Sequence, residues 1–312
     1  WLTKAGLTSI TPIITKSNGK IDKFEVVQEA CLETANNLQT LIIDILLFYP
    51  NGITKEVKKV LIKPETITII DELNGFDAPE AVLLNFNDWA YVKLVLDKDS
   101  TNYFRKNLNL VSDVLTRQMI YRSFFDMVRD AKLSCVEYVD LICAFLGQES
   151  SEDIVSPTLR YLTGAITNYL PLEFYTEYAD KIFVLCLNLL NKFKGEEQML
   201  MNVIQQIPSV AVTQVSQQLL ADWLKINVNK KEKDLVINFS YGSVSGEFPE
   251  KLFNQEIRFA VVKTIYGSSF FSKDFQEALL NQEVEREGNS DESISVKNYC
   301  RGSENSIENK AK

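Results

Sequence analysis

Up to about residue 97, the chain alternates between short apolar runs and turn-forming residues. The apolar runs are rich in β-branched and aromatic side chains, and turn signals such as Ser17-Asn18-Gly19 and Asn74-Gly75 separate them. This spacing predicts a compact antiparallel β-sandwich, because each run has the length of one strand. The predicted strands are Thr8 to Thr15, Lys23 to Ala30, Gln39 to Tyr49, Thr54 to Ile62, Thr66 to Asp71, Ala81 to Phe86 and Ala90 to Leu96.

After Asp97 the apolar positions recur at helical steps of three and four residues, which predicts amphipathic helices. Ser134-Cys135-Val136-Glu137 is a capping box that predicts a helix start, and Ser156-Pro157 predicts another. Gly195 predicts the end of a long helix. Further helices are predicted from Ser112, and at Phe174 to Lys194, Gln198 to Gln206, Thr213 to Ile226, Phe253 to Tyr266, Asp274 to Glu287 and Asp291 to Cys300.

Together these patterns predict a multi-domain fold, an all-β sandwich followed by an all-α superhelical, solenoid-like domain. The expected domains are residues 1–97 and residues 98–312. No strict repeat signature marks the helical part, so ordinary helical bundling is the alternative. An exposed loop is expected between Asn227 and Glu247, where the basic run Lys230 to Lys233 and the segment Ser240 to Gly246 lie.

Charge and composition exclude several classes of function. The chain has no histidine among its 312 residues, which excludes a histidine-based metal site, a Ser-His-Asp triad and a Cys-His pair within it. A net charge of -9 argues against nucleic acid as a partner, because binding a phosphate backbone requires clustered Lys and Arg. Leu41 to Tyr49 is the longest apolar stretch, and it is too short to span a bilayer, so no membrane segment is predicted.

Five cysteines occur without any CxxC spacing, and we interpret them as free thiols, which favours a reducing, cytoplasmic compartment. Acidic pairs are present as well. Asp126 and Asp130 lie one helical turn apart, but Arg129 between them makes a surface ion pair the better interpretation than a cation site. We attribute Glu149, Glu152 and Asp153 to helix ends.

The aromatic side chains are interpreted mainly as core. Trp1, Trp89 and Trp223 have core spacing. A cluster around Pro171 predicts packing between consecutive helices, and the alternative is a peptide-binding wall; it consists of Tyr169, Phe174, Tyr175 and Tyr178.

Three segments resemble the aminopeptidase N family of zinc metallopeptidases. The run Trp1 to Gly6 resembles the junction between that family's catalytic domain and its β-sandwich. The run Ala81 to Asp97 is similar to the segment that ends the sandwich, with its Asn, then Tyr-x-basic, then Asp. Arg122 to Leu133 is similar to the helix and loop that open the family's C-terminal helical domain.

The resemblance implies a non-catalytic role for this chain. In the family, a His-Glu-x-x-His helix and a downstream glutamate bind zinc in the catalytic domain, which would precede Trp1. We therefore expect no catalytic, cofactor-binding or metal-ligating residue here, zinc in the missing catalytic domain, and no activity of this chain alone. Its expected role is to enclose the active site and control peptide access, with the N-terminal catalytic domain of the same polypeptide and peptide substrates as partners.

The resemblance also implies that the chain is a fragment, cut before Trp1 and truncated after Lys312. The alternative to the aminopeptidase hypothesis is a non-enzymatic α-solenoid scaffold or adaptor that binds proteins.

Overall fold

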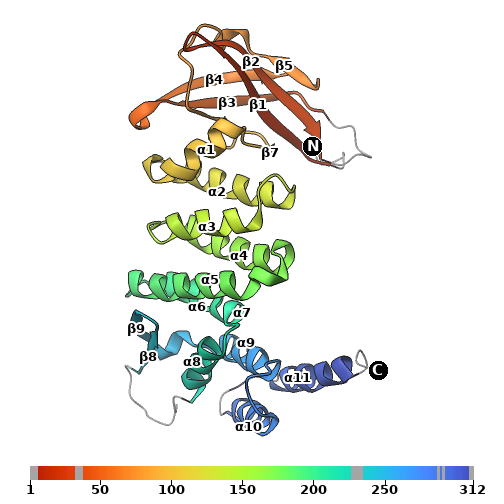
Figure 1. Ribbon diagram of the computed structural model, residues 1–312, viewed down its shortest axis with the longest axis vertical. Coiled ribbons are helices and arrows are strands. Elements are labelled where there is room, and N and C mark those ends of the chain that lie inside the picture. The colour runs from red at the N-terminus through yellow and green to blue at the C-terminus, as the bar shows by residue number, and fades with distance from the viewer. Residues whose placement is uncertain (1–5, 32–37, 226–234, 287–288, 290–291, 309–312) are drawn as a thin grey trace. The chain divides into compact units, whose positions relative to one another are not determined.

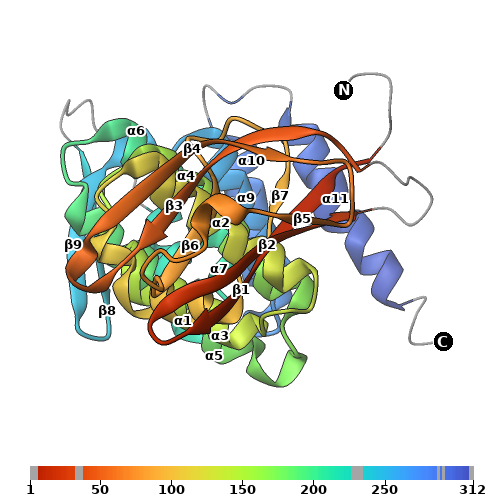
Figure 2. The same cartoon turned by 90° about the horizontal axis from the view of Figure 1, so that it is seen from above.

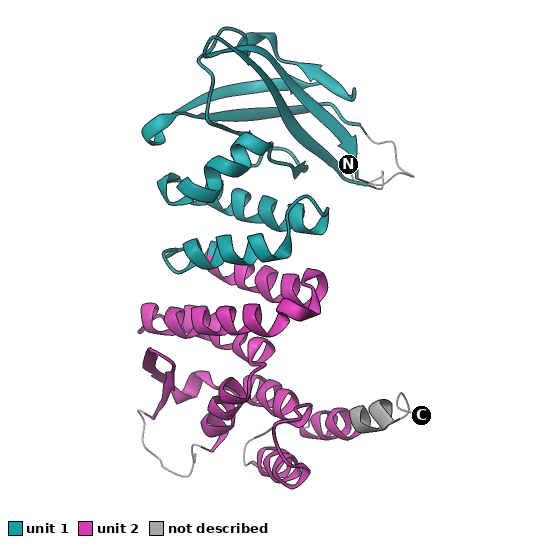
Figure 3. Ribbon diagram, in the orientation of Figure 1, with its two compact units in different colours: residues 1–154 teal, residues 155–312 magenta. Residues whose placement is uncertain are grey.

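The structure is a computed structural model that describes residues 6–31, 38–225, 235–286, 289 and 292–308, with side chains described as far as Arg301. It divides into two compact units, residues 1–154 and residues 155–312 (Figure 3). The predicted basic run Lys230 to Lys233 and Trp1 lie outside the described residues. The change from strands to helices occurs at Lys98, inside the first unit (Figure 1).

Two sheets begin the first unit (Figure 2). Their strand orders are β5-β2-β1-β7 and β4-β3-β6. The strands are β1 (Thr8–Ser17), β2 (Lys20–Ala30), β3 (Leu41–Phe48), β4 (Thr54–Ile62), β5 (Ile67–Ile69), β6 (Ala81–Phe86) and β7 (Lys93–Leu94). Each predicted strand is therefore present, although the ends of several strands lie a few residues from the predicted positions.

Local sequence explains the β1–β2 hairpin. Asn18 and Gly19 have φ values of 50° and 74°, the left-handed conformation that a two-residue hairpin turn requires. Alternate residues then point inward, and Ile10 and Phe24 have no exposed surface. From the second sheet, Ile43, Ile45 and Leu47 are equally buried, so the two inner faces share one apolar core.

One feature of the sandwich differs from the antiparallel expectation. β7 pairs with β1 in parallel, with Ser9 opposite Lys93 and Ile10 opposite Leu94. The chain leaves β6 in the second sheet and reaches the edge of the first sheet beside β1. The parallel pairing is short, because α1 begins at Lys98 only four residues after Leu94.

The helices of the first unit follow the sandwich: α1 (Lys98–Asn107), α2 (Val114–Arg129) and α3 (Cys135–Leu146). The predicted cap of α3 is confirmed, because the Ser134 hydroxyl accepts a hydrogen bond from the Glu137 amide at 3.2 Å. The same hydroxyl donates to the Glu137 carboxylate at 2.8 Å. These bonds satisfy donors that the first helical turn would leave free.

The helix α4 (Glu152–Tyr169) starts one turn earlier than predicted, so Pro157 lies inside it rather than at its first position. A proline in a helix removes the backbone hydrogen bond to the carbonyl four residues earlier, here that of Asp153. The side chain of Gln118 donates to that carbonyl at 3.1 Å. A partner from α2 thus replaces the missing bond, which the local sequence around Ser156-Pro157 does not reveal.

The second unit is mainly helical, and α4 leads into it. Its other helices are α5 (Leu172–Lys192), α6 (Glu197–Ile204), α7 (Ile207–Val210), α8 (Gln214–Leu224), α9 (Gln255–Tyr266), α10 (Lys273–Val284) and α11 (Glu292–Glu308). These match the predicted helices apart from the short α7, and Gly195 adopts a φ of 95° just after α5, as its predicted stop requires.

The segment from Ser240 to Gly246 is exposed or half-buried, as predicted, but it is not a loop. The strands in it also make the predicted all-α description of the helical domain wrong. The segment forms a β-hairpin of β8 (Val236–Tyr241) and β9 (Val244–Pro249). Ile237, Phe239 and Phe248 are buried, while Gly242 supplies the turn with a φ of 56°. The Gly and Ser residues that suggested a loop instead belong to this hairpin. At Gly246 the Asn191 side chain approaches the backbone closely, because a Cβ on Gly246 would lie 1.9 Å from the Asn191 Oδ1.

Candidate functional site

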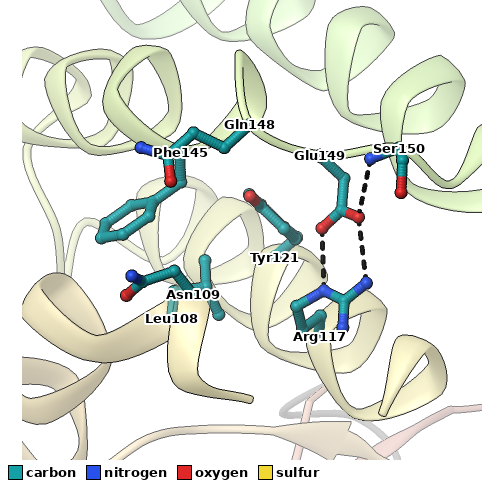
Figure 4. Close-up of a pocket in the computed structure, with 8 residues that line it drawn as sticks. All are labelled: Leu108, Asn109, Arg117, Tyr121, Phe145, Gln148, Glu149 and Ser150. Atoms are coloured by element: carbon teal, nitrogen blue, oxygen red, sulfur yellow. Dashed lines mark hydrogen bonds and ion pairs between the residues drawn. The ribbon is translucent and has the colours of Figure 1, made fainter. Parts of the chain in front are cut away.

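A polar pocket of about 350 Å³ lies in the helical part of the first unit. Its walls come from α2, from α3 and the loop before α4, and from the 3-10 turn Leu108–Leu110. The residues that line it are Leu108, Asn109, Arg117, Tyr121, Phe145, Gln148, Glu149 and Ser150 (Figure 4).

One side of the pocket is a buried ion pair. Arg117 donates from Nε to Glu149 Oε2 at 2.8 Å and from Nη2 to Oε1 at 3.0 Å (Figure 4). Its Nη1 donates to the carbonyls of Val111 and Ser112 at 2.8 and 2.7 Å. The two side chains are 14% and 6% exposed, so this bidentate pair joins α2 to two loops in a largely dry environment.

The protonation states follow from these contacts. Burial acts to raise the pKa of Glu149, but the Arg117 guanidinium and the amides of Ser150 and Ser151 outweigh it and hold that pKa below its ordinary value. Burial raises the pKa of the Tyr121 phenol, and the nearby charge of Glu149 adds to this effect. The carboxylate is therefore ionised and the phenol neutral at physiological pH.

This arrangement suits binding better than proton transfer. Glu149 is ionised and occupied by strong donors, so it is a poor general base or acid. The Tyr121 hydroxyl faces the side of the pocket where Phe145 and Gln148 lie (Figure 4). With the exposed carboxamides of Asn109 and Gln148, it offers uncharged donors and acceptors beside the aromatic ring of Phe145. A neutral polar ligand matches this lining.

The part of the chain that contains the pocket also matches a known protein family. Residues 81–238 match the family model described as ERAP1-like C-terminal domain, and this match covers more than half of the chain. The chain belongs to this family. The pocket and α2 to α8 lie within the matched residues.

A curated relative supports the same family. Aminopeptidase N from Streptomyces lividans is 30% identical to this chain over 178 residues, which cover 54% of the chain and 21% of the relative. The resemblance to the aminopeptidase N family is thus confirmed, and the chain is a C-terminal domain of that family. It spans only about a fifth of the length of the relative, so the activity of the whole relative is not carried over by this match alone.

The structure of this ERAP1-like domain separates the acidic residues that the sequence had placed together. Asp126 pairs with Arg129 at 3.3 Å, as predicted, whereas Asp130 pairs with Lys93 at 2.5 Å. Glu152 and Asp153 lie in the first turn of α4, as expected. Glu149, which was also attributed to a helix end, lies in the loop between α3 and α4, and its carboxylate pairs with Arg117.

The aromatic predictions have mixed outcomes. Trp223 is 2% exposed and packs edge-on against Phe248, with ring centroids 5.1 Å apart, so its core assignment is confirmed. Trp89 is 70% exposed, so its core assignment is wrong. In the cluster around Pro171, Tyr178 is buried, whereas Tyr169 and Phe174 are 44% and 38% exposed. Helix packing therefore accounts for only part of that cluster.

Metal-binding clusters and membrane-spanning helices are both absent from the described residues. Within them, no group of three or more histidine, cysteine or acidic side chains is arranged to hold a metal ion. Among the helices of the described ranges, none has the length and apolar character needed to cross a bilayer.

Sequence reasoning missed Arg117, the residue that organises the pocket. Its partner Glu149 is 32 positions away, and no local pattern links the two. It also missed the environment of Trp89. The sequence does contain a signal for this environment. The consecutive Lys58-Lys59 interrupts the alternation of β4, and Asn87-Asp88 precedes Trp89; such patterns are typical of bulges and turns.

Proposed function

We propose that this chain is the non-catalytic C-terminal portion of a zinc-dependent aminopeptidase, in which it encloses the active site and controls the access of peptides. The observation that carries the proposal is the match of a histidine-free chain to the ERAP1-like C-terminal domain. A chain without histidine has no His-Glu-x-x-His site, so the zinc and the catalytic residues would belong to an N-terminal catalytic domain of the same polypeptide. That domain and peptide substrates are the proposed partners.

In this proposal, residues 1–97 form a spacer sandwich and residues 98–312 a helical domain of solenoid character. The helices α2 and α3 of the first unit would form part of the wall around the active site, and the pocket around Tyr121 and Gln148 would provide neutral hydrogen-bonding groups for a peptide main chain. We expect such a wall to act on long substrates, because only a peptide that extends beyond the catalytic centre would contact it.

The experiment uses the intact aminopeptidase that carries this region. Gln148→Ala removes an exposed carboxamide and should raise KM for peptides that are long enough to reach the pocket, without changing hydrolysis of an aminoacyl chromogenic substrate. Lys98→Gln, an exposed change outside the pocket, is the matched control. Equal effects on long and short substrates, or no effect on either, would count against a role of this pocket in peptide access.

A second measurement tests whether this chain lacks peptidase activity and bound zinc by itself. The purified 312 residues should neither turn over the chromogenic substrate nor bind stoichiometric zinc by elemental analysis. Turnover or stoichiometric zinc in this chain would contradict the proposal.

A further inference from the structure

Asp44 in β3 lies between two β-bulges. On one side, the ladder with β4 passes from Ile43 opposite Val60 to Ile45 opposite Val57. On the other side, the ladder with β6 passes from Asp44 opposite Phe86 to Ile45 opposite Leu84. Bulges on both neighbouring strands at one position are a built feature, because each interrupts ladder hydrogen bonds and bends its strand.

The bulged strands contain residues in the left-handed backbone conformation. Lys59 on β4 and Asn85 on β6 both have a φ of 55°, and Asn87 and Asp88 follow at 66° and 54°. Left-handed backbone is unfavourable by about 1–2 kcal/mol at most residues other than glycine, and such strain gathers at binding sites. Asparagine and aspartate tolerate this conformation, so Lys59 is the strained residue of the four. The strained Lys59 and the three left-handed Asn and Asp residues together shape the surface around Asp44.

The Asp44 carboxylate holds this surface in place. It accepts hydrogen bonds from the Lys59 amide at 2.8 Å and from the indole Nε1 of Trp89 at 2.9 Å. Burial acts to raise the pKa of Asp44, but these hydrogen bonds outweigh it and hold the pKa below its ordinary value. The indole is thus fixed by its nitrogen while 70% of the residue remains exposed.

A cavity of about 490 Å³ lies beside the fixed indole, lined by Ile42, Asp44, Lys58, Lys59, Asn87 and Trp89. Ile42 is 60% exposed, so an apolar wall faces solvent. Successive strand residues normally point to opposite faces, and the bulge is what allows both Lys58 and Lys59 to line one cavity.

The two lysines differ in their partners. The Lys58 ammonium pairs with Glu56 at 3.2 Å. In the part of the chain that the structure describes, no ion pair involves Lys59. The Asp44 oxygens accept two close hydrogen bonds, and the positive charge of Lys58 acts on the same carboxylate. The cavity consequently combines a rigid aromatic face, an aliphatic wall and one available cation.

We propose that this cavity binds a small anion with a planar apolar body, such as an aromatic carboxylate. The body would lie against the Trp89 indole and Ile42, and the carboxylate would pair with the Lys59 ammonium. A volume of about 490 Å³ falls within the range of small-molecule sites. The proposal does not depend on the aminopeptidase function.

Isothermal titration calorimetry on the 312-residue chain tests the site with three probes. Indole-3-acetate supplies both the planar body and the charge, indole-3-acetamide lacks the charge, and acetate lacks the body. We expect indole-3-acetate to bind, the amide to bind about threefold more weakly, and acetate not to bind, because an exposed ion pair adds a modest term to an aromatic contact.

Variants then locate the binding. Lys59→Gln should reduce the affinity for indole-3-acetate to that for the amide, whereas Lys98→Gln, an exposed lysine on α1, should leave it unchanged. Trp89→Ala should weaken binding of both indoles at least about tenfold, as expected for a central aromatic contact. Far-UV circular dichroism identifies any variant that fails to fold, and Trp89→Phe keeps a ring in place as a second test. Absence of binding at millimolar indole-3-acetate, or binding that Trp89→Ala leaves unchanged, would overturn the proposal.

Discussion

Replacing Arg117 with leucine should destabilise the first unit more than any surface change. The substitution leaves the Glu149 carboxylate, which is 6% exposed, without its cation, and it removes both donors to the carbonyls of Val111 and Ser112. Two unit charges about 4 Å apart interact by about 4 kcal/mol at an effective dielectric constant of about 20. Breaking one side of a buried pair accordingly lowers the free energy of unfolding by about 3–5 kcal/mol.

Urea unfolding followed by far-UV circular dichroism measures the total change. Hydrogen exchange with mass spectrometry shows where it occurs, because protection should fall in α2 and α3 while α8 and α9 of the second unit serve as an internal control. A double-mutant cycle with Glu149→Leu isolates the pair itself. We expect the double variant to lose about 2 kcal/mol less than the sum of the single changes, since it leaves no unpaired charge.

The pair also predicts a pH dependence with a definite sign. The pKa of Glu149 in the folded chain lies below its ordinary value of 4.5, so its stabilisation is complete above that value. As the pH falls through the lowered pKa, the carboxylate takes up a proton and the stabilisation is lost. The difference in stability between the wild type and Glu149→Gln should therefore shrink as the pH is lowered below 4.5. A loss below about 1 kcal/mol for Arg117→Leu at pH 7, or additive single changes, would refute the reasoning.

Three further changes test local features of the fold, each by urea unfolding. Gly246→Ala should destabilise the second unit by about 1–3 kcal/mol, because the new Cβ would lie 1.9 Å from the Asn191 Oδ1, whereas Gly242→Ala has open space and should lose only about 1 kcal/mol through its positive φ. Ala131→Gly should stabilise the first unit by about 0.5–1 kcal/mol, since Ala131 follows α2 with a φ of 56°, and an unchanged stability would contradict this. Ser134→Ala should destabilise α3 by about 1 kcal/mol through the lost cap, and Ser134→Thr, which keeps a hydroxyl that can accept from the Glu137 amide and donate to its carboxylate, should retain most of the stability.

The sandwich was predictable from sequence because its signals are local. The Asn18-Gly19 turn sets the register of β1 and β2, and alternation at Ile10 and Phe24 gives the buried face. Helix starts were predictable where the cap lies beside the helix, as at Ser134. The start of α4 was not, because Gln118 on another helix satisfies the carbonyl that Pro157 leaves free.

The pockets were less accessible to sequence reasoning, since each depends on contacts between distant residues. Arg117 and Glu149 meet only after α2 and α3 pack, and each residue type is common on helix surfaces. In sequence, Trp89 looks like a core residue. Its exposed position was not predictable, because it depends on two bulges and on a hydrogen bond to Asp44 in another strand. The hairpin β8–β9 was missed because the Gly and Ser residues of its turn outweighed the alternation of Ile237 and Phe239.

Sequencing the native transcript upstream of the codon for Trp1 tests the central claim most directly. The account predicts a continuous reading frame that encodes a His-Glu-x-x-His helix and a downstream glutamate, which would supply the histidine ligands that this chain lacks. An initiation codon immediately before Trp1, or an upstream frame without those ligands, would contradict the aminopeptidase proposal and favour a binding scaffold.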